Sequence, residues 1–350
     1  MGSIGFNQPT ATAVGTDRSG SPVATLPHGR VSASENMLPL VIVNPKSASG
    51  ATRDNWSSIA SDLRTHFGAF QVAFTKGPGD GIDLARRSAQ EGRRFIIACG
   101  GDGTINEIAN GILTSDTDCE LGIFPSGTGG DFRRTIKMPS ELREAARALR
   151  EGKTRAIDVG KVTYNNHDGD EESRYFLNVS SFGLAASIIG RVKGSTSLNW
   201  LPVDSVRGRA SFALSTLQEV VALGSTQVRV KIDDDEERPL TTVNFCVANA
   251  RYFGGGMMIA PEAKIADGFL DVINIGDIKT AKIILRAYTL YRGTHLELPE
   301  VKDRLAKRIA ARPFDGEDVH IEVDGELLGR LPALYEVAPA ALKVRVPPVK

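Results

Sequence analysis

The spacing of apolar residues alternates between two patterns from residue 37 to residue 157. Short runs of branched and aromatic residues are typical of buried strands, whereas apolar residues three and four positions apart are typical of helices that bury one face. Strands that alternate with helices predict a mostly parallel, doubly wound α/β sheet. The expected strands are 38–43, 70–75, 94–99 and 120–124, and the expected helices are 54–67, 80–91, 105–113 and 141–151.

The pattern changes after residue 157, where apolar runs of strand length become frequent and turn residues separate several of them. We therefore predict a second, β-rich domain at 158–350, although its last strand, near 335–350, could return to the first sheet. Residues 1–36, which precede the first domain, are rich in Gly, Ser, Thr, Ala and Pro and are expected to form a disordered tail. The expected strands are 156–164, 174–179, 227–232, 242–248, 269–275, 319–323 and 343–346, and the expected helices are 209–223 and 280–291.

Composition narrows the class of protein. The chain has 350 residues, with 42 Lys and Arg against 42 Asp and Glu. This balance argues against a nucleic-acid-binding protein, which usually carries a basic excess. No run approaches the ~18 consecutive apolar residues of a membrane-spanning helix. Cys99, Cys119 and Cys246 lie far apart without a CxxC pair, so we interpret them as buried thiols in a reducing compartment and expect no zinc site.

The strongest motif is CGGDGTINE, residues 99–107, at the end of an expected strand. Three glycines, Gly100, Gly101 and Gly103, let backbone N–H groups approach a bulky anion closely. The helix that follows presents unpaired N–H donors that suit phosphate. Asp102 alone would repel a phosphate, but it fits this place if magnesium links it to a nucleotide. The segment therefore predicts a phosphate-binding loop.

A helix cap is the structural alternative for the same segment. Thr104 and Glu107 match the capping box, in which Thr caps the helix and Glu reaches back to it. A cap does not require the three glycines, so we favour phosphate binding and expect the cap to operate beside it. The GxGxxG pattern of a dinucleotide-binding Rossmann loop is absent from this segment.

Two further loops rich in Gly and Ser follow expected strands. The first, NPKSASG at 44–50, offers hydroxyl groups, a cation and a glycine, but by itself it could equally be an ordinary turn. The second is PSGTGGDFRR at 125–134, where Arg133 and Arg134 could meet phosphate or an anionic headgroup, or lie on a solvated helix face. Because ligands of doubly wound sheets bind beyond the carboxyl ends of the strands, we expect the three loops to meet.

Taken together, these loops resemble those of the diacylglycerol kinase catalytic-domain family, which includes soluble bacterial lipid kinases and the sphingosine and ceramide kinases. GGDGT alone is shared with NAD kinases and phosphofructokinases, so the order of the other elements makes the resemblance specific. One departure is Gly130, which stands where the family usually has Asn and leaves the nucleotide preference open. The similar segments are 44–50 (NPxSG), 100–104 (GGDGT), 121–131 (PxGTxND), 249–257 with 260–261 and 267–268 (second-domain signature), and 324–326 (DGE).

The resemblance implies a nucleotide-binding α/β domain at 37–157, a β-sandwich lipid-substrate domain at 158–350, and a cleft between them. It also implies transfer of the γ-phosphate of ATP, with Mg²⁺, to the hydroxyl of a lipid such as diacylglycerol. Carried over position by position, the nucleotide-binding residues are Asn44, Pro45, Lys46, Ser47, Gly50, Thr75, Gly101, Asp102, Gly103, Thr104, Ile105, Asn106, Glu107 and Thr128.

The catalytic assignments follow from the DGE triplet. The resemblance implies that Glu326 is the general base, with Asp324 as the alternative, and that Asp102 is the magnesium-linked carboxylate. Without the resemblance, the sequence would favour a plain β-turn at this Asp-Gly pair.

The resemblance also implies a structural magnesium site in the second domain. Its ligands would be the Asp267 side chain and the backbone carbonyls of Lys264 and Phe269, and such oxygen ligands suit magnesium. An Asp-Gly turn that binds no metal is the alternative.

Two other functions stay open at this point: a NAD kinase-like small-molecule kinase, and a non-catalytic lipid-binding protein of the same fold. We expect a cytoplasmic protein that meets its lipid at the surface of an anionic membrane and binds no nucleic acid; a homodimer is one option. Which lipid accepts the phosphate is left open. The cations expected to face the membrane are Arg133, Arg134, Lys137, Lys302, Arg304, Lys307 and Arg308.

Overall fold

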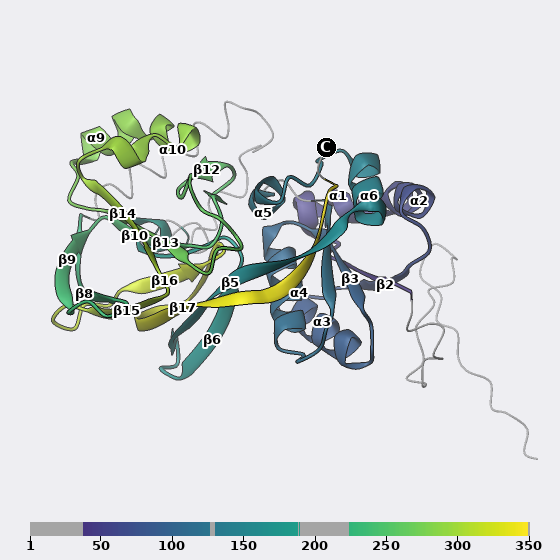
Figure 1. The fold of residues 1–350 in the computed structure, drawn as a ribbon, viewed down its shortest axis with the longest axis horizontal. Helices are drawn as coiled ribbons and strands as arrows, with labels where there is room; N and C mark the ends of the chain where they lie inside the picture. Colours follow the sequence, from purple (N-terminus) through teal and green to yellow (C-terminus); the bar gives the residue numbers. More distant parts are fainter. Residues whose placement is uncertain (1–37, 127–129, 188, 190–223, 349–350) are drawn as a thin grey trace, which may run out of the picture.

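The computed structural model describes residues 38–126, 130–187, 189 and 224–348 as two lobes joined by long strands (Figure 1). The expected tail at 1–36, the expected helix at 209–223 and the candidate Thr128 lie outside the described residues.

The first lobe is built on four parallel strands, in the order β4-β3-β1-β2. Buried branched and aromatic side chains form its core, while α3 packs against α4 and α2 against α6. This arrangement confirms the predicted doubly wound α/β domain. Its elements are β1 (Leu40–Val43), α1 (Ala51–Asp54), α2 (Trp56–His66), β2 (Gln71–Phe74), α3 (Asp80–Gln90), β3 (Phe95–Gly100), α4 (Asp102–Leu113), β4 (Glu120–Pro125), α5 (Asp131–Thr135) and α6 (Leu142–Glu151).

The second lobe consists mainly of antiparallel strands that enclose a separate apolar core, which confirms the predicted β-sandwich-like domain. The Phe182 and Phe245 rings stack in this core with centroids 4.9 Å apart. The elements are β5 (Lys153–Asn166), β6 (Glu171–Phe176), β7 (Val179–Gly183), β8 (Thr226–Ile232), β9 (Arg238–Thr242), β10 (Asn244–Ala248), β11 (Tyr252–Phe253), β12 (Met257–Met258), β13 (Leu270–Ile275), α9 (Thr280–Arg286), α10 (Tyr288–Arg292), β14 (Val301–Ala306), β15 (Arg308–Pro313), β16 (His320–Val323) and β17 (Glu326–Val346).

The last strand, β17, belongs to both lobes. It pairs with β16 where it begins, runs antiparallel to β5 for most of its length, and ends in parallel pairing with β4 at Lys343 and Val344. Its residues Leu342 and Val344 are buried in the core of the first lobe. The segment that we expected could return to the first sheet therefore lies beside β4, and 15 strands of the described chain share one sheet.

Strands β9, β11, β12, β14 and β15 were not predicted. In β15 the buried Ile309 and Ala311 alternate with exposed residues, but only over six positions. In β14 only the end residues Val301 and Ala306 are buried, against different apolar clusters, and the four residues between them are exposed. The expected strand at 174–179 is in fact the end of β6 and the start of β7, separated by two residues.

Candidate active site

The glycine loop after β3 and the loop before α5 are joined by one carboxylate. Asp102 accepts hydrogen bonds from three successive backbone N–H groups, those of Gly130 at 2.7 Å, Asp131 at 3.0 Å and Phe132 at 3.2 Å. These are the free N–H groups at the start of α5, where a carboxylate is favourable. Asp102 thus fixes the loop at 125–134 against the glycine loop after β3.

The loop after β1 meets the same place. The Asn44 amide donates to the Thr104 hydroxyl at 3.0 Å, and the Thr52 hydroxyl donates to the Ser126 carbonyl at 3.0 Å. Gly100 is required here, because a Cβ at this position would lie 2.5 Å from the Thr104 hydroxyl oxygen. The three loops therefore meet at the carboxyl edge of β1, β3 and β4, as we expected from the position of each loop after a strand.

The turn Ser47–Gly50 has an unusual backbone. Ala48, Ser49 and Gly50 have φ values of 52°, 57° and 94°, so three consecutive residues are left-handed. Two of them carry a Cβ, for which this conformation is unfavourable, and such strain is concentrated at binding and active sites. Lys46 lies just before the turn, where its N–H donates to the Asn44 side chain at 3.0 Å.

The expected capping box is wrong. The helix α4 begins at Asp102, three residues before the predicted start, and its N-cap residue Gly101 has no side-chain cap. Glu107 instead accepts hydrogen bonds from the N–H groups of Gly79 at 2.9 Å and Gly81 at 3.0 Å, at the start of α3. Thr104, the expected cap, lies inside α4, so it cannot cap this helix. The Glu107 carboxylate stabilises the start of the neighbouring helix α3 instead.

Several residues expected to bind nucleotide have side chains that are occupied elsewhere. Ile105 is buried in the first core, and Thr75 is 8% exposed at the end of β2. The Asn106 amide donates to the Tyr175 carbonyl at 3.0 Å and to Asp324 at 2.8 Å. The Glu107 carboxylate faces α3. The side chains of Ile105, Asn106 and Glu107 therefore contact other parts of the protein, which differs from the expected contacts with a nucleotide.

Asn106 and Asn110 join the two lobes. The Asn110 amide donates to the Tyr175 carbonyl at 2.9 Å, and the Tyr175 N–H donates back to the Asn110 side chain at 2.9 Å. This pairing connects the middle of α4 to the end of β6, and in Figure 1 α4 lies at the junction beside β5 and β17. Sequence reasoning missed it, because partners about 65 residues apart leave no local pattern.

Asp324 and Gly325 form a two-residue turn between β16 and β17, with φ values of 46° and 86°. The Asp324 carboxylate is buried and accepts the N–H groups of three consecutive residues, Leu177, Asn178 and Val179, at 2.8 to 3.0 Å, as well as the Asn106 amide. Burial raises the pKa of Asp324 to about 6, against the opposing effect of these donors. Its oxygens are fully committed to the protein.

Glu326, two residues later, has a different environment. Its side chain is 33% exposed, and its Oε2 lies 3.5 Å from the Arg174 guanidinium. Its Oε1 lies 4.0 Å from the point where a Cβ on Gly103 would stand, so the carboxylate faces the glycine loop across the junction of the lobes. Of the two acidic residues in the triplet, Glu326 is the one whose oxygens are not filled by backbone donors. Arg174, which was not among the expected residues, orients it.

Asp131 is a second residue that the expected site list omitted, although it stands in the PxGTxND-like element. Its side chain is buried, and it accepts the Gly255 N–H at 2.8 Å and the Arg134 guanidinium at 2.7 Å. Burial raises the pKa of Asp131. The contact fixes the glycine-rich 254–256 turn of the second lobe against α5.

The departure at Gly130 has a conformational explanation. This residue has a φ of 78° and is the N-cap of α5. Gly and Asn are the residues that most readily adopt a left-handed backbone, so one can replace the other here.

The expected structural metal site is a turn before β13. Asp267 Oδ1 accepts the Phe269 N–H at 3.2 Å, and the Gly268 N–H donates to Asp158 at 2.7 Å. The described residues contain no group of three or more His, Cys, Asp or Glu side chains arranged to hold a metal ion. The pKa of Asp271 is nevertheless raised to about 6, by burial and by the negative charges of Asp267, Asp303 and Glu262. A divalent cation bound through Asp267 and backbone carbonyls, including those of Lys264 and Phe269, would relieve this repulsion, so the residues fit magnesium chemically.

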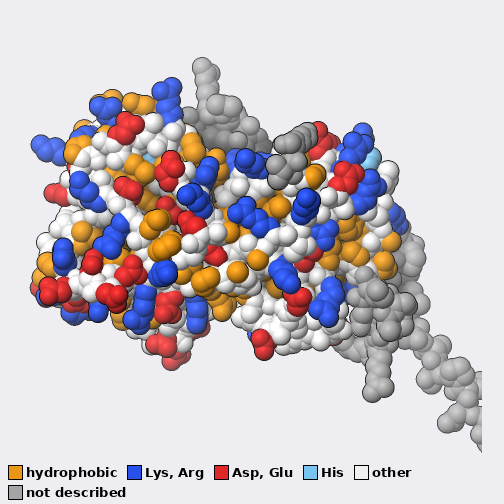
Figure 2. Space-filling model, in the orientation of Figure 1, with side chains coloured by type: hydrophobic (Ala, Val, Ile, Leu, Met, Phe, Trp, Pro, Cys, Tyr) orange, Lys and Arg blue, Asp and Glu red, His pale blue; other side chains and the backbone are white. Residues whose placement is uncertain are grey.

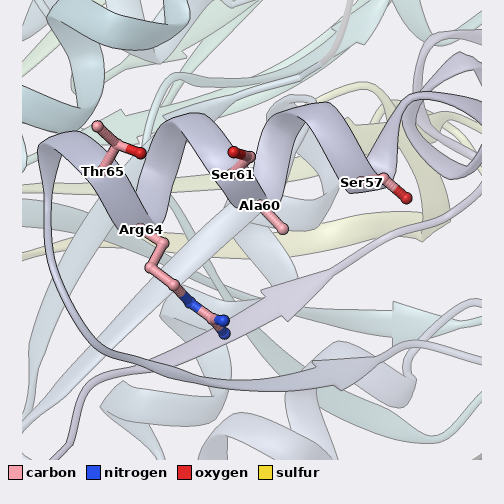
Figure 3. A pocket seen from close by; sticks show the side chains of 5 residues that line it. All are labelled: Ser57, Ala60, Ser61, Arg64 and Thr65. Carbon is pink, nitrogen blue, oxygen red and sulfur yellow. The ribbon is translucent and has the colours of Figure 1, made fainter.

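A cavity of about 290 Å³ lies elsewhere, on the outer side of α2. Figure 3 shows its lining side chains, all from this one helix: Ser57, Ala60, Ser61, Arg64 and Thr65. None of these residues belongs to the loops described above, so we do not assign the chemistry to this cavity.

A glycine loop at the start of a helix on one lobe, faced by a carboxylate from a β-sandwich-like lobe, is the arrangement expected from the resemblance to lipid kinases. Two family descriptions match in succession: "Diacylglycerol kinase catalytic domain" at residues 39–162, and "YegS C-terminal NAD kinase beta sandwich-like domain" at residues 191–346. The chain therefore contains a diacylglycerol kinase catalytic domain followed by a β-sandwich-like domain.

Individual relatives agree with this assignment. A protein named diacylglycerol kinase from Mycobacterium tuberculosis is 28% identical over 310 residues, covering 87% of this chain and 94% of the relative. One of the same name from Staphylococcus saprophyticus is 27% identical over 261 residues, covering 75% of this chain and 79% of the relative. A crystal structure of a candidate diacylglycerol kinase from Bacillus anthracis has a TM-score of 0.69 at 27% identity, covering 89% of this chain and 95% of that chain.

Proposed function

We propose that this enzyme transfers the γ-phosphate of ATP to the hydroxyl of a membrane lipid such as diacylglycerol. The observation that carries the proposal is the position of Glu326, whose carboxylate reaches from the second lobe to the glycine loop of the first. Phosphoryl transfer needs positioned phosphates, neutralised charge and a group that accepts the proton of the attacking hydroxyl. The two facing surfaces supply the first and the last of these.

The first lobe binds the nucleotide through backbone groups. The N–H groups of Gly101 and Gly103, at the start of α4, are donors for phosphate oxygens, and the turn Ser47–Gly50 with its left-handed residues adds backbone groups nearby. Lys46 contributes a positive charge beside them. These assignments rest on main-chain geometry more than on side chains.

Asp102 is the carboxylate that would link magnesium to the nucleotide. It already accepts three N–H groups, and a carboxylate offers about four lone-pair positions, so it has room for one further ligand. Magnesium, when bound with the nucleotide, would neutralise charge that builds up on the phosphates during transfer.

Glu326 accepts the proton of the acceptor hydroxyl, and Arg174 holds the carboxylate in place. Asp324 does not act as the base in this proposal, because four protein donors occupy its oxygens. It is a positioning residue that holds the turn so that Glu326 faces Gly103.

The experiment is a phosphorylation screen. Purified enzyme is incubated with ATP, magnesium and a total lipid extract in mixed micelles, and the products are identified by mass spectrometry. We expect a phosphorylated lipid alcohol, with diacylglycerol as the first candidate. Phosphorylation of NAD with no lipid product would favour the NAD kinase-like alternative, and no turnover of either would favour a non-catalytic lipid-binding protein.

We also propose peripheral contact with an anionic membrane and, for Asp267, Lys264 and Phe269, a structural magnesium site. No helix in the described part of the chain is long and apolar enough to cross a bilayer. Because the acceptor proposed above resides in a bilayer, the enzyme would reach it from the water side.

A further inference from the structure

The second lobe exposes an apolar helix surface that the active site does not use. Six large hydrophobic side chains are exposed in the described residues, and three of them, Leu285, Tyr288 and Tyr291, lie on α9 and α10. They are 69%, 51% and 56% exposed. Their spacing of three residues places them along one side of the helical segment, whereas Thr289 is buried and Leu290 packs against the protein. We call these three side chains the α9–α10 surface.

Within the helical segment itself the charges have one sign. From Lys279 to Arg292 the sequence contains four cations and no acidic residue. Arg286 and Arg292 are exposed beside Tyr288: the first lies 3.4 Å from its hydroxyl, and the second lies 5.8 Å from its ring centroid. Lys282 is paired with Glu300 at 2.5 Å, and Asp277 precedes the segment. Figure 2 shows hydrophobic and basic side chains side by side along the upper left edge, where Figure 1 places α9 and α10, with acidic side chains close by.

We propose that the α9–α10 surface docks the enzyme on an anionic lipid membrane, with Leu285, Tyr288 and Tyr291 entering the interface and Arg286 and Arg292 contacting the headgroups. Helical segments with exposed aromatic and aliphatic residues flanked by cations are suited to this position. Tyrosine in particular combines an apolar ring with a polar tip that stays at the headgroup level.

Two alternatives to this docking fit the charges less well: residues 190–223 of the same chain could cover the α9–α10 surface, or other cations could face the membrane. The sequence between β7 and β8 that lies outside the described residues, 190–223, carries four basic and two acidic residues, so it has the same sign of charge as the surface. The cations that we expected to face the membrane are already engaged in several cases: Arg304 pairs with Asp235, and Arg308 with Glu336. An anionic bilayer complements both the apolar and the basic character of the α9–α10 surface.

The position of this surface agrees with the proposed acceptor, on which the inference rests. In Figure 1, α9 and α10 lie toward the same side of the molecule as α1 and α5, which adjoin the nucleotide loops. Docking through α9 and α10 would therefore bring that side of both lobes to the bilayer.

The test is sedimentation with vesicles of phosphatidylcholine alone or mixed with phosphatidylglycerol. Wild type should bind the mixed vesicles more tightly, and salt should weaken binding. The triple variant L285S/Y288S/Y291S should bind at least about tenfold more weakly, because it loses apolar burial in the interface. Arg286→Gln and Arg292→Gln should each cost roughly fivefold. The matched control L38S/F74S, which removes two exposed hydrophobic residues of the first lobe, should bind like wild type.

Activity separates docking from the proposed function. The triple variant should keep its turnover of a short-chain, water-soluble diacylglycerol and lose efficiency with the same lipid in vesicles. Vesicle binding decides the docking whichever acceptor the enzyme uses. Unchanged binding of the triple variant would overturn the inference, as would a wild-type dimer that this variant converts to monomers, because the surface would then join two copies of the chain.

Discussion

Each side of the candidate active site depends on a carboxylate that accepts three consecutive backbone N–H groups. In the first lobe Asp102 binds residues 130–132, and in the second lobe Asp324 binds residues 177–179. The settings differ. Asp102 caps a short helix, whereas Asp324 lies in a turn between two strands and has a fourth donor in Asn106.

The difference indicates how the two sides divide the work. In the first lobe the Asp102 carboxylate holds the backbone loops together, and those loops contact the nucleotide in our proposal. In the second lobe the Asp324 carboxylate fixes a turn, and its partly exposed neighbour Glu326 faces the glycine loop. A carboxylate that accepts several backbone N–H groups acts as a positioning group, whereas a carboxylate without such donors stays available for proton transfer.

Loss of Asp102 should have the largest effect. Asp102→Ala leaves three N–H groups without their acceptor and removes the carboxylate proposed to link magnesium, so we expect ATP-dependent phosphorylation to fall below detection while the fold persists. Turnover at saturating magnesium and a melting curve test this. Asp102→Asn is the matched control, since its remaining oxygen can still accept part of the backbone bonds. Near-normal turnover of the Ala variant would remove Asp102 from the mechanism.

Glu326→Gln should lower the rate of lipid phosphorylation by about 10²–10⁴, the usual contribution of general acid–base catalysis. Gln keeps the size of the side chain but cannot accept the proton, so ATP affinity should barely change. Asp324→Asn is the informative partner, because we expect it to lower thermal stability more than it lowers the chemical step. The roles would be reversed if Asp324→Asn lost the greater rate while Glu326→Gln stayed within a few fold of wild type.

Burial on the second side should make stability depend on pH. Glu322 accepts the Ser181 hydroxyl at 2.6 Å and the Gly325 N–H at 2.9 Å, and burial raises its pKa to about 7. A raised carboxyl pKa favours folding below the unfolded value, near pH 4.5, and this contribution is lost as pH rises toward 7. We expect the free energy of unfolding to fall by on the order of 2 kcal/mol over that window because of Glu322.

Denaturant unfolding at several pH values checks this expectation. Glu322→Gln should flatten the decline, although the raised pKa of Asp324 acts in the same direction and will leave part of it. Glu171→Gln, at an exposed position on β6, should keep the wild-type profile. An identical slope in wild type and Glu322→Gln would show that this carboxyl does not titrate as proposed.

The smallest effect concerns Asp267, a carboxylate that accepts only one N–H in its turn. If magnesium binds there in the native state alone, it should raise the melting temperature of wild type by a few degrees and leave Asp267→Ala unchanged. The measurement is made without nucleotide. Asp315→Ala, in another exposed Asp-Gly turn, is the control. Equal magnesium shifts in all three proteins would exclude the site.

The predictability of the fold followed the local pattern. β1 and β3 were recognisable because their branched residues are buried on both sides. Most of β17 was not, because Pro332 and Pro339 interrupt it and a proline argues against an interior strand. The pairing with β5 shifts register at both prolines, between Arg330 and Ala333 and between Ala338 and Leu342, which is how one strand continues past them.

The sequence predicted the part of the candidate site that consists of backbone N–H groups in glycine-rich loops. The part where side chains bond across the fold was not predictable. Asn106 and Asp324 are 218 positions apart, and Arg174 and Glu326 are 152 apart. The sequence placed Glu107 and Asp324 in the right motifs, but only the tertiary contacts reveal that one stabilises a neighbouring helix and the other a turn.

The course of β17 also constrains the order in which the chain can fold. Leu342 and Val344 complete the core of the first lobe, yet the ribosome makes them after nearly all of the second lobe. Until then β4 has an unpaired edge, the kind of surface that promotes aggregation in partly folded chains. A fragment cut after residue 157 would keep that edge permanently. The nucleotide lobe is therefore the first to be synthesised and among the last to be finished.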